Sequence, residues 1–332
     1  MAEAKPRVAV VVGAMNADIQ AWSLDENWRE GDSNPGLVSE TPGGVGRNIA
    51  ENLLRLGFRS SLVTVLGDDA RASWLEADCR RLGLDLSASL RLEGRGSPVY
   101  LCLLDGAGRL VGAVADMGAL DSLDPAFVRG RFDLMDGADL LVIDANLGAE
   151  TIAVLAERYG RGGTLDREGR PRPRLVWDPV SVAKAGRGRA VLGRFDLIKP
   201  NRAEAAALTG SADPSPQALA AALRRLLGSE PPLFLSLGAE GLFFEGGEVR
   251  GKGRHGIVRP PSLPLVSVSG AGDAALASLA RDLVLGGTLE EMAARAIAAA
   301  ALTASSRETV FPGLNAGGLE ALAQGVEHEF LS

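Results

Sequence analysis

The run Val8-Ala-Val-Val-Val-Gly13 is continuous, apolar and β-branched, as expected for a strand that is covered on both faces. Comparable apolar runs recur along the chain at 61–66, 140–144, 175–178, 197–199 and 233–237. Helical patterns lie between them, for example at 46–56, 69–82, 217–227 and 273–285. Strands that alternate with helices indicate βαβ units on a parallel sheet, and right-handed crossovers place the helices on both faces. The sequence therefore predicts a doubly wound α/β body with a mainly parallel sheet, formed as a single domain over 1–332.

Two stretches interrupt this alternation. Residues 19–40 show no helical period, and Asp32-Ser-Asn-Pro-Gly36 within them has strong turn chemistry. Residues 97–117 show the pattern of a long hairpin with its turn at Asp105-Gly-Ala-Gly108. We expect these segments to form a small sheet that projects over one edge of the body as a lid. Such a lid could cover a ligand cleft or pair with a second subunit, and the pattern leaves both roles open.

Composition excludes several classes of protein. The 332 residues include 42 acidic and 35 basic ones, a formal net charge of −7, which argues against a nucleic-acid binder. Cys79 and Cys102 are too few for a disulfide scaffold or a cysteine metal centre, so we expect them to be reduced and partly buried. His255 and His328 lack a metal-binding spacing. Neither a signal peptide nor a run of about 18 apolar residues is present, so we expect a soluble cytoplasmic enzyme without a membrane partner.

The most informative segment runs from Val266 to Leu279. Strand-like residues lead into Gly270-Ala-Gly272, and Asp273 then opens an alanine-rich helix. Small residues allow a tight turn that brings consecutive N–H groups to a helix N-terminus, which is a natural anion site. A carboxylate beside it could accept a proton from a hydroxyl that attacks a phosphoryl group. Asp is also a favoured N-cap, so capping and catalysis are equally open for Asp273 from this segment alone.

A second glycine-rich segment precedes the helical pattern at 46–56. Gly43, Gly44 and Gly46 permit close backbone approach, and Asn48 could turn its amide toward a sugar hydroxyl. The segment is neither a GxGxxG dinucleotide fingerprint nor a P-loop, which argues against a dinucleotide oxidoreductase. A structural role and a ligand contact are equally open here.

Two further turns carry polar groups. Asn201 and Glu204 have the spacing of a capping box, which favours a structural role, although they could also position a magnesium–water cluster near phosphates. Ser236-Leu-Gly-Ala-Glu-Gly241 ends a strand with a glycine turn. This turn fits an ordinary hairpin, and it could also approach a nucleotide closely.

Taken together and in this order, the segments resemble the ribokinase family of carbohydrate and nucleoside kinases. Gly43 to Asn48 is similar to the first family signature, 266–273 to the second, and Asn201 to Glu204 to the Asn-x-x-Glu motif. Within that family the chain is most similar to the pseudouridine kinases. That closer similarity is carried by Asn16-Ala-Asp18, Gly31-Asp-Ser-Asn-Pro-Gly36, Gly43-Gly-Val-Gly-Arg-Asn-Ile-Ala-Glu-Asn52, Asp116-Met117, Asp144-Ala-Asn-Leu147 and Asp178-Pro-Val-Ser181.

The resemblance implies an activity and a set of site residues. The activity is ATP-dependent phosphorylation of the ribose 5′-hydroxyl of pseudouridine, with Asp273 as base and an anion hole formed by the N–H groups of Gly270, Ala271 and Gly272. The substrate contacts that it implies are Asp18 on the ribose 2′- and 3′-hydroxyls, Gly44 and Asn48 beside it, Asn16 in support, and Ser33, Asn34 and Asn146 at the base or sugar. On the ATP side it implies Asn201 and Glu204 toward Mg²⁺ and phosphate, Glu204 through water, and Ser236 and Gly238 near the nucleotide.

One departure and several alternatives accompany the resemblance. Where the family commonly has Asp-Thr ahead of its Gly-Ala-Gly-Asp, this chain has Ser267-Val268, which puts activation by a monovalent cation in doubt. A kinase for ribose or an ordinary N-nucleoside is the nearest alternative, and a catalytically silent binding protein on the same fold is another. We also expect a homodimer formed through the lid, because an exposed sheet edge seeks cover.

Overall fold

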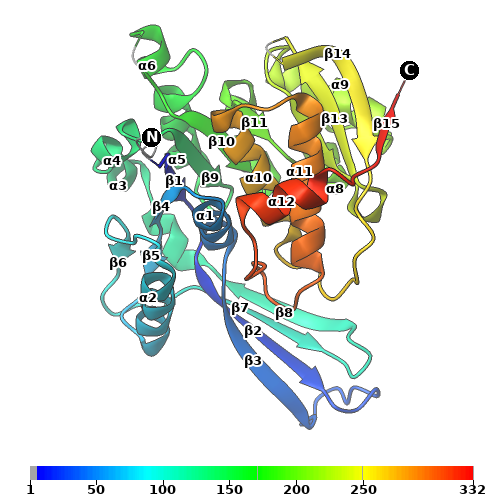
Figure 1. Ribbon diagram of the computed structural model, residues 1–332. Coiled ribbons are helices and arrows are strands. Elements are labelled where there is room, and N and C mark those ends of the chain that lie inside the picture. Colours follow the sequence, from blue (N-terminus) through cyan, green and yellow to red (C-terminus); the bar gives the residue numbers. More distant parts are fainter. Residues whose placement is uncertain (1–5, 170, 249, 332) are drawn as a thin grey trace.

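A parallel sheet forms the centre of the protein. The computed structural model describes residues 6–169, 171–248 and 250–331 (Figure 1). Five strands pair in parallel in the order β11-β10-β9-β1-β4. Their bounds are β1 (Val8–Val12), β4 (Arg59–Val63), β9 (Leu140–Asp144), β10 (Arg174–Asp178) and β11 (Leu197–Ile198).

Helices cover both faces of this sheet. The α-helices are α1 (Val45–Arg55), α2 (Ala70–Leu82), α3 (Pro125–Arg129), α4 (Phe132–Asp136), α5 (Ala149–Tyr159), α6 (Thr164–Arg167), α7 (Val182–Ala185), α8 (Arg202–Thr209), α9 (Pro216–Leu227), α10 (Ala271–Leu285), α11 (Leu289–Ala304) and α12 (Ala316–Ala323). Short 3-10 helices are η1 (Gly118–Ser122), η2 (Gly186–Arg194) and η3 (Gly238–Glu240).

The alternation of side chains along β1 divides the core in two. Ala9 and Val11 join one cluster with residues of α1, α10, α11 and α12. Val10 and Val12 join a second cluster with residues of α3, α4, α5 and α9. Because successive side chains of a strand point to opposite faces, each face of the sheet has its own helical layer. The predicted doubly wound α/β class is confirmed.

A second sheet projects from the body. The strands β2 (Asn16–Ser23), β3 (Gly36–Gly43), β7 (Val99–Leu104) and β8 (Leu110–Asp116) pair in the order β3-β2-β7-β8. In Figure 1 this projecting sheet extends below the parallel sheet. The segments 19–40 and 97–117 supply most of these strands. Two very short strands, β5 (Val65–Leu66) and β6 (Leu90–Arg91), pair separately.

The run 233–237 was predicted as a further strand of the parallel sheet, but it forms the first strand of an antiparallel sheet that follows β11. This antiparallel sheet contains β12 (Leu233–Ser236), β13 (Leu242–Gly247), β14 (Arg250–Val258) and β15 (His328–Phe330) in that order. The N–H of Ser236 donates to the carbonyl of Pro200 at 2.9 Å, so β12 continues the sheet beside β11. The predicted hairpin turn after β12 is present, as η3.

Two simpler expectations concern single features. Cys79 and Cys102 are free and buried, as predicted. In the part of the chain that the structure describes, no helix combines the length and the apolar character needed to cross a bilayer.

Candidate functional site

The N-terminus of α10 is the centre of the candidate site. Gly270 is the N-cap and has φ of 77°, and a Cβ there would collide with the carbonyl of Thr309. Only glycine adopts this conformation at such close approach without strain. The first N–H groups of a helix have no partner within the helix, so this end can bind an anion.

Asp273 lies in the first turn of α10 and does not cap it. Its Oδ2 accepts a hydrogen bond of 2.8 Å from Nδ2 of Asn48, in the first turn of α1. Burial raises the pKa of Asp273 to about 8, and the carboxylate of Asp178 adds to this shift, while the Asn48 amide opposes it. The capping interpretation is therefore wrong, because Gly270 occupies the cap position. The two glycine-rich segments meet through these side chains.

The orientation of the Asn48 amide is fixed by two donors. Its Oδ1 accepts from Nη1 of Arg47 at 3.2 Å and from Oγ1 of Thr309 at 3.3 Å. Nδ2, the donor end, is thereby directed to Asp273. Arg47 is itself only 5% exposed and pairs with Glu51. Arg47 and Thr309 were missed from the sequence, since neither has a chemistry-specific spacing.

A polar cavity of about 490 Å³ opens beside Asn48 and the start of α10. It is lined by Ala14, Asn16, Asp18, Gly44, Val45, Asn48, Tyr100, Ala115, Met117, Asn146, Val180, Ser181, Lys184, Ser269, Gly270 and Thr309. Five predicted substrate residues are therefore brought together, although they come from three separate segments. Asn16 donates to Oδ1 of Asp18 at 2.6 Å, while burial raises the pKa of Asp18.

Lys184 is a cavity residue that the sequence analysis missed. Its Nζ donates to Oδ1 of Asn146 at 2.5 Å, and burial lowers its pKa. Arg187 donates to the carbonyl of Asn146 at 3.0 Å and holds the same loop. The available signal was a lysine three residues after the quoted Asp178-Pro-Val-Ser181 segment, but a single lysine has no spacing that marks a binding site.

Ser33 and Asn34 are not brought to the cavity. Ser33 is exposed in the turn between β2 and β3. Asn34 uses its side chain to hold that turn, accepting from the N–H of Arg29 at 2.8 Å and donating to the Arg29 carbonyl at 3.0 Å. The polar side chain of Asn34 therefore stabilises the predicted turn and does not contact the cavity.

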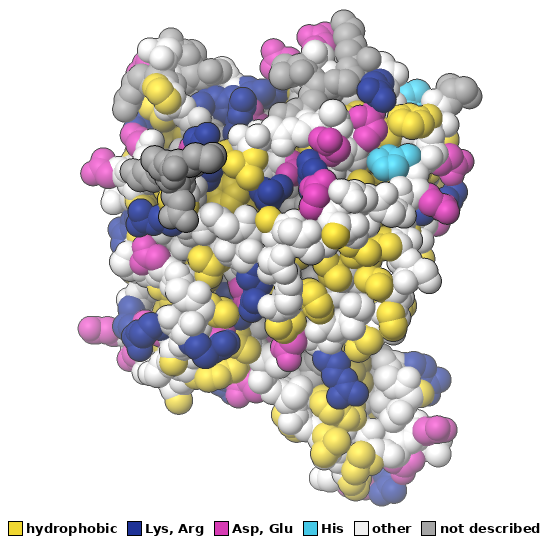
Figure 2. Space-filling view, viewed as in Figure 1, with side chains coloured by type: hydrophobic (Ala, Val, Ile, Leu, Met, Phe, Trp, Pro, Cys, Tyr) yellow, Lys and Arg dark blue, Asp and Glu magenta, His cyan; other side chains and the backbone are white. Residues whose placement is uncertain are grey.

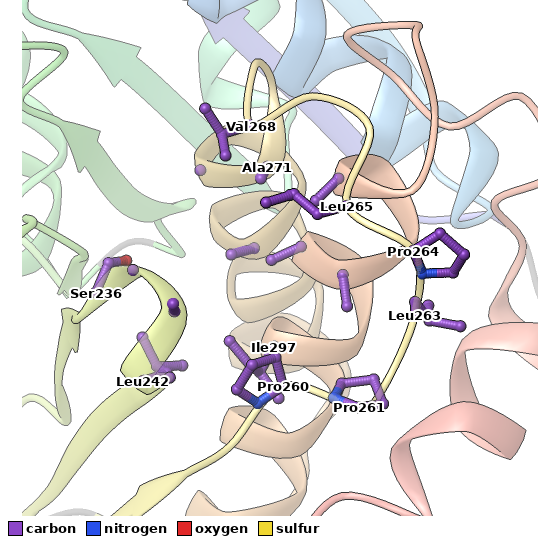
Figure 3. A pocket seen from close by; sticks show the side chains of 18 residues that line it. Ser236, Leu242, Pro260, Pro261, Leu263, Pro264, Leu265, Val268, Ala271 and Ile297 are labelled. Carbon is purple, nitrogen blue, oxygen red and sulfur yellow. The ribbon is translucent and has the colours of Figure 1, made fainter.

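An apolar cavity of about 370 Å³ lies on the other side of the start of α10. Figure 3 shows its labelled side chains arranged between the end of β12, the helices α10 and α11, and the loop that contains Pro260 to Val268. Ser236 and Gly238, which were predicted near the nucleotide, line the wall of this cavity together with Ala271 and Gly272, which were predicted in the anion hole. The remaining lining residues are Ala239, Gly241, Leu242, Pro260, Pro261, Leu263, Pro264, Leu265, Val268, Ala275, Ile297, Ala300, Ala301 and Ala304.

A buried lysine links this wall to the carboxylates. Lys199 is 5% exposed, and its Nζ donates to Oγ of Ser236 at 3.2 Å. Its positive charge opposes the rise in pKa that burial causes at Asp178, Glu204 and Asp273. A Cβ at Gly272 would lie 3.8 Å from the ammonium group. From the sequence, Lys199 was predicted only as part of a strand.

Asn201 and Glu204 form the predicted capping box at the start of α8. The Asn201 side chain accepts from the N–H of Glu204, and Oε2 of Glu204 accepts from the N–H of Asn201, both at 2.9 Å. Burial raises the pKa of Glu204. Neither residue lines either of the two cavities described above.

Comparisons with known proteins agree with this arrangement. The family model described as pfkB family carbohydrate kinase matches residues 7–315. The pseudouridine kinase of Escherichia coli (strain K12) is 31% identical over 320 residues, which cover 96% of this chain and 97% of that protein. A solved carbohydrate kinase from Agrobacterium tumefaciens has a TM-score of 0.78 and 29% identity, covering 98% of this chain and 100% of its own.

A more distant structure shows how widely the fold is shared. Arabidopsis thaliana ribokinase complexed with ribose and ATP has a TM-score of 0.79 at 20% identity, covering 96% of this chain and 99% of its own. The family resemblance drawn from the sequence is confirmed.

Proposed function

This chain belongs to the pfkB family of carbohydrate kinases, and we propose that within it the protein transfers the γ-phosphoryl group of ATP to the 5′-hydroxyl of pseudouridine. The products are pseudouridine 5′-phosphate and ADP. The observation that carries the proposal is the position of Asp273, in the helix turn where the two cavities meet. Gly270 lines the polar cavity, while Ala271 and Gly272 line the apolar one.

The transfer requires a base and a site for negative charge. Asp273 accepts the proton of the 5′-hydroxyl as that oxygen bonds to the γ-phosphorus, and the bond to the ADP oxygen breaks. The N–H groups of Gly270, Ala271 and Gly272 stabilise the charge on the transferring oxygens. A pKa of about 8 suits a base that works near neutral pH.

The polar cavity supplies groups for the ribose. The ionised carboxylate of Asp18 can accept hydrogen bonds from both vicinal hydroxyls, which favours ribose over deoxyribose. Asn16 holds that carboxylate through its hydrogen bond of 2.6 Å. Gly44, with φ of 100°, lets the backbone approach the sugar where a side chain would collide with Ala14.

The nucleotide side combines an apolar wall with buried charge. Ser236 and Gly238 approach the nucleotide, and Lys199 beneath them offsets phosphate charge. The buried carboxylates of Asp178 and Glu204 are hard oxygen donors that fit Mg²⁺, with Glu204 acting through water. Bound Mg²⁺ supplies charge neutralisation on the phosphates.

Two observations lead us to propose pseudouridine as the substrate in place of other ribosyl compounds. The E. coli relative named as a pseudouridine kinase matches this chain along nearly its whole length. Pseudouridine also carries one more ring N–H than uridine, and its recognition needs an added acceptor. Asn146 and Ser181 bring such oxygens into the polar cavity, with Lys184 as a donor beside them.

The test is ADP release with magnesium–ATP and pseudouridine, uridine, inosine or ribose at equal concentration. We expect a clear preference for pseudouridine. A preference for inosine or ribose would replace the substrate and keep the phosphoryl-transfer mechanism. Inactivity with all four, together with nucleoside binding in a calorimeter, would establish the silent binding protein instead.

The projecting sheet is also proposed to join two copies of the chain. Its exposed apolar side chains include Leu37, Val38, Leu110, Val111 and Val114. Figure 2 shows hydrophobic side chains gathered on this part of the surface. Consecutive residues of a strand point to opposite faces, so these apolar side chains are exposed on both faces of the sheet, and a partner that covers one face would stabilise it. Light scattering of the protein should give twice the monomer mass, and a monomer would contradict this arrangement.

A further inference from the structure

Val180 has a backbone conformation that valine normally avoids. Its φ is +64°, and it is the non-glycine residue with positive φ among those described. The N–H of Ser181 donates to the carbonyl of Pro179 at 2.6 Å, which closes a three-residue turn around Val180. The N–H of Val180 donates to Oδ1 of Asp178 at 2.7 Å. A β-branched residue in this region is a genuine outlier and carries a free-energy cost.

The turn alone does not explain why valine is present. Glycine would form the same turn without strain, so the side chain must supply what glycine lacks. The isopropyl group is only half-buried. It packs partly against the core cluster that contains residues of α3, α4, α5 and α9, and it lines the polar cavity. Complete burial in the core would have explained the residue as packing. Its exposure to the cavity points to a ligand instead.

The side chains that line the cavity indicate the class of that ligand. Polar side chains such as Asp18, Asn48 and Asn146 match hydroxyls and ring edges, but they offer no surface for a flat apolar face. Val180 and Met117 add apolar side chains to the same cavity. A planar heterocycle needs such a surface, whereas a free sugar does not.

We propose that Val180 is a specificity-determining residue whose side chain contacts the planar base of a nucleoside substrate. The inference rests on the proposed function and deepens it, because it separates nucleosides from free ribose. Strain in the turn at Val180 is retained because the side chain improves binding of the base.

Val180→Gly tests this directly, since it keeps the turn and removes the side chain. We expect KM for pseudouridine to rise roughly tenfold or more, while KM for ATP and any turnover of free ribose change by less than about twofold. The midpoint of thermal unfolding should not fall, because the strain is relieved. Val180→Ala should raise KM similarly but lower the midpoint, because alanine keeps the strain. Val182→Ala, at the neighbouring exposed valine, is the matched control and should leave KM and the midpoint unchanged.

Each other outcome contradicts the inference. If Val180→Gly lowers the unfolding midpoint and leaves KM for pseudouridine unchanged, Val180 is a packing residue. Equal rises in KM for pseudouridine, ribose and ATP would show a general distortion of the site. A wild-type protein that neither phosphorylates nor binds any nucleoside would overturn the proposed function, and this inference with it. If the wild-type protein phosphorylates pseudouridine and Val180→Gly has the same KM for it, only the inference about Val180 is overturned and the proposed function stands.

Discussion

The two cavities that meet at α10 are built from opposite kinds of side chain. The polar cavity gathers amides, a carboxylate and an ammonium group from segments far apart in the sequence. The apolar cavity is lined largely by alanine, proline and leucine from α10, α11 and the loop before α10. Hydrogen-bonding groups discriminate between ligands strongly, because a missing partner leaves a buried polar group unpaired. The polar cavity is therefore suited to discriminate between substrates. The apolar cavity is suited to bind its ligand mainly by shape.

Small side chains on α10 and α11 leave space for the apolar cavity. Ala275, Ala300 and Ala304 face the apolar cavity, where larger side chains would fill the space. Helix propensity is kept while room is left for a flat ligand. The polar cavity is lined instead by glycine at Gly44 and Gly270 and by residues of the projecting sheet.

The largest expected effect comes from Asp273, in the helix turn where the two cavities meet. Asp273→Asn removes the base and keeps the shape, so kcat should fall by roughly a thousandfold or more, with pseudouridine binding largely kept. ADP release and titration calorimetry measure the two quantities. Turnover within about tenfold of wild type would show that another group accepts the proton.

Asp18→Asn should disturb the polar cavity alone. We expect kcat/KM for pseudouridine to fall about a hundredfold and discrimination against the 2′-deoxy analogue to shrink, because an amide cannot accept both hydroxyl protons equally well. KM for ATP should stay unchanged in the same assays. A larger effect on ATP than on pseudouridine would reverse the assignment of the two cavities.

Ala300→Leu should disturb the apolar cavity alone. The added side chain occupies the ligand space, so KM for ATP should rise about tenfold while pseudouridine binding without ATP is unchanged. Ala207→Leu, on the exposed face of α8 and outside both cavities, is the control. Unchanged ATP kinetics in Ala300→Leu would show that the nucleotide binds elsewhere.

The pH dependence of activity should report Asp273. Its ionised form is the base, and its pKa lies at about 8, so kcat/KM should rise with pH and level off above that value. Asn48→Ala removes a hydrogen bond that favours the ionised form, and should move the rise to higher pH. A profile that is flat between about pH 6 and 9 would contradict this role.

The smallest expected effect is on stability. Because the folded-state pKa of Asp273 is raised, its contribution to stability is complete below the unfolded-state value and is lost as the pH rises through about 8. Asp273→Asn removes this loss, so the variant should unfold a few degrees above wild type at about pH 9 and show less advantage at about pH 5. Thermal unfolding at the two pH values measures the difference.

Local patterns predicted the parallel body and the glycine turns, because strand runs and tight turns are written in adjacent residues. The α10 segment is the clearest case, since the small residues and the carboxylate lie within four positions. The sheet of β12 to β15 was not predicted, because β13 and β14 contain glycine and charge in place of an apolar alternation. The last strand pair, β14 with β15, also joins residues about 70 positions apart.

Side-chain partners in the site were less accessible to sequence reasoning. Asp18 and Asn16 lie at the base of β2 and line the cavity, whereas Ser33 and Asn34 lie in the turn between β2 and β3 and do not. Turn chemistry marked the second pair, but a turn at the far end of a projecting sheet is distant from its base. The hydrogen-bond partners of Lys184 and Lys199 are Asn146 and Ser236, which lie far away in the sequence. Only the fold brings these pairs together.

The path of the chain through the projecting sheet has a mechanical consequence. The eight residues of β2 extend about 26 Å from its root, where Asp18 lies only two residues along. A tilt of the sheet by about 10° around that root would displace its tip by about 4–5 Å and Asp18 by only about 1 Å. A rotation of the sheet about this root would thus move its tip far more than the residues of the proposed ribose site.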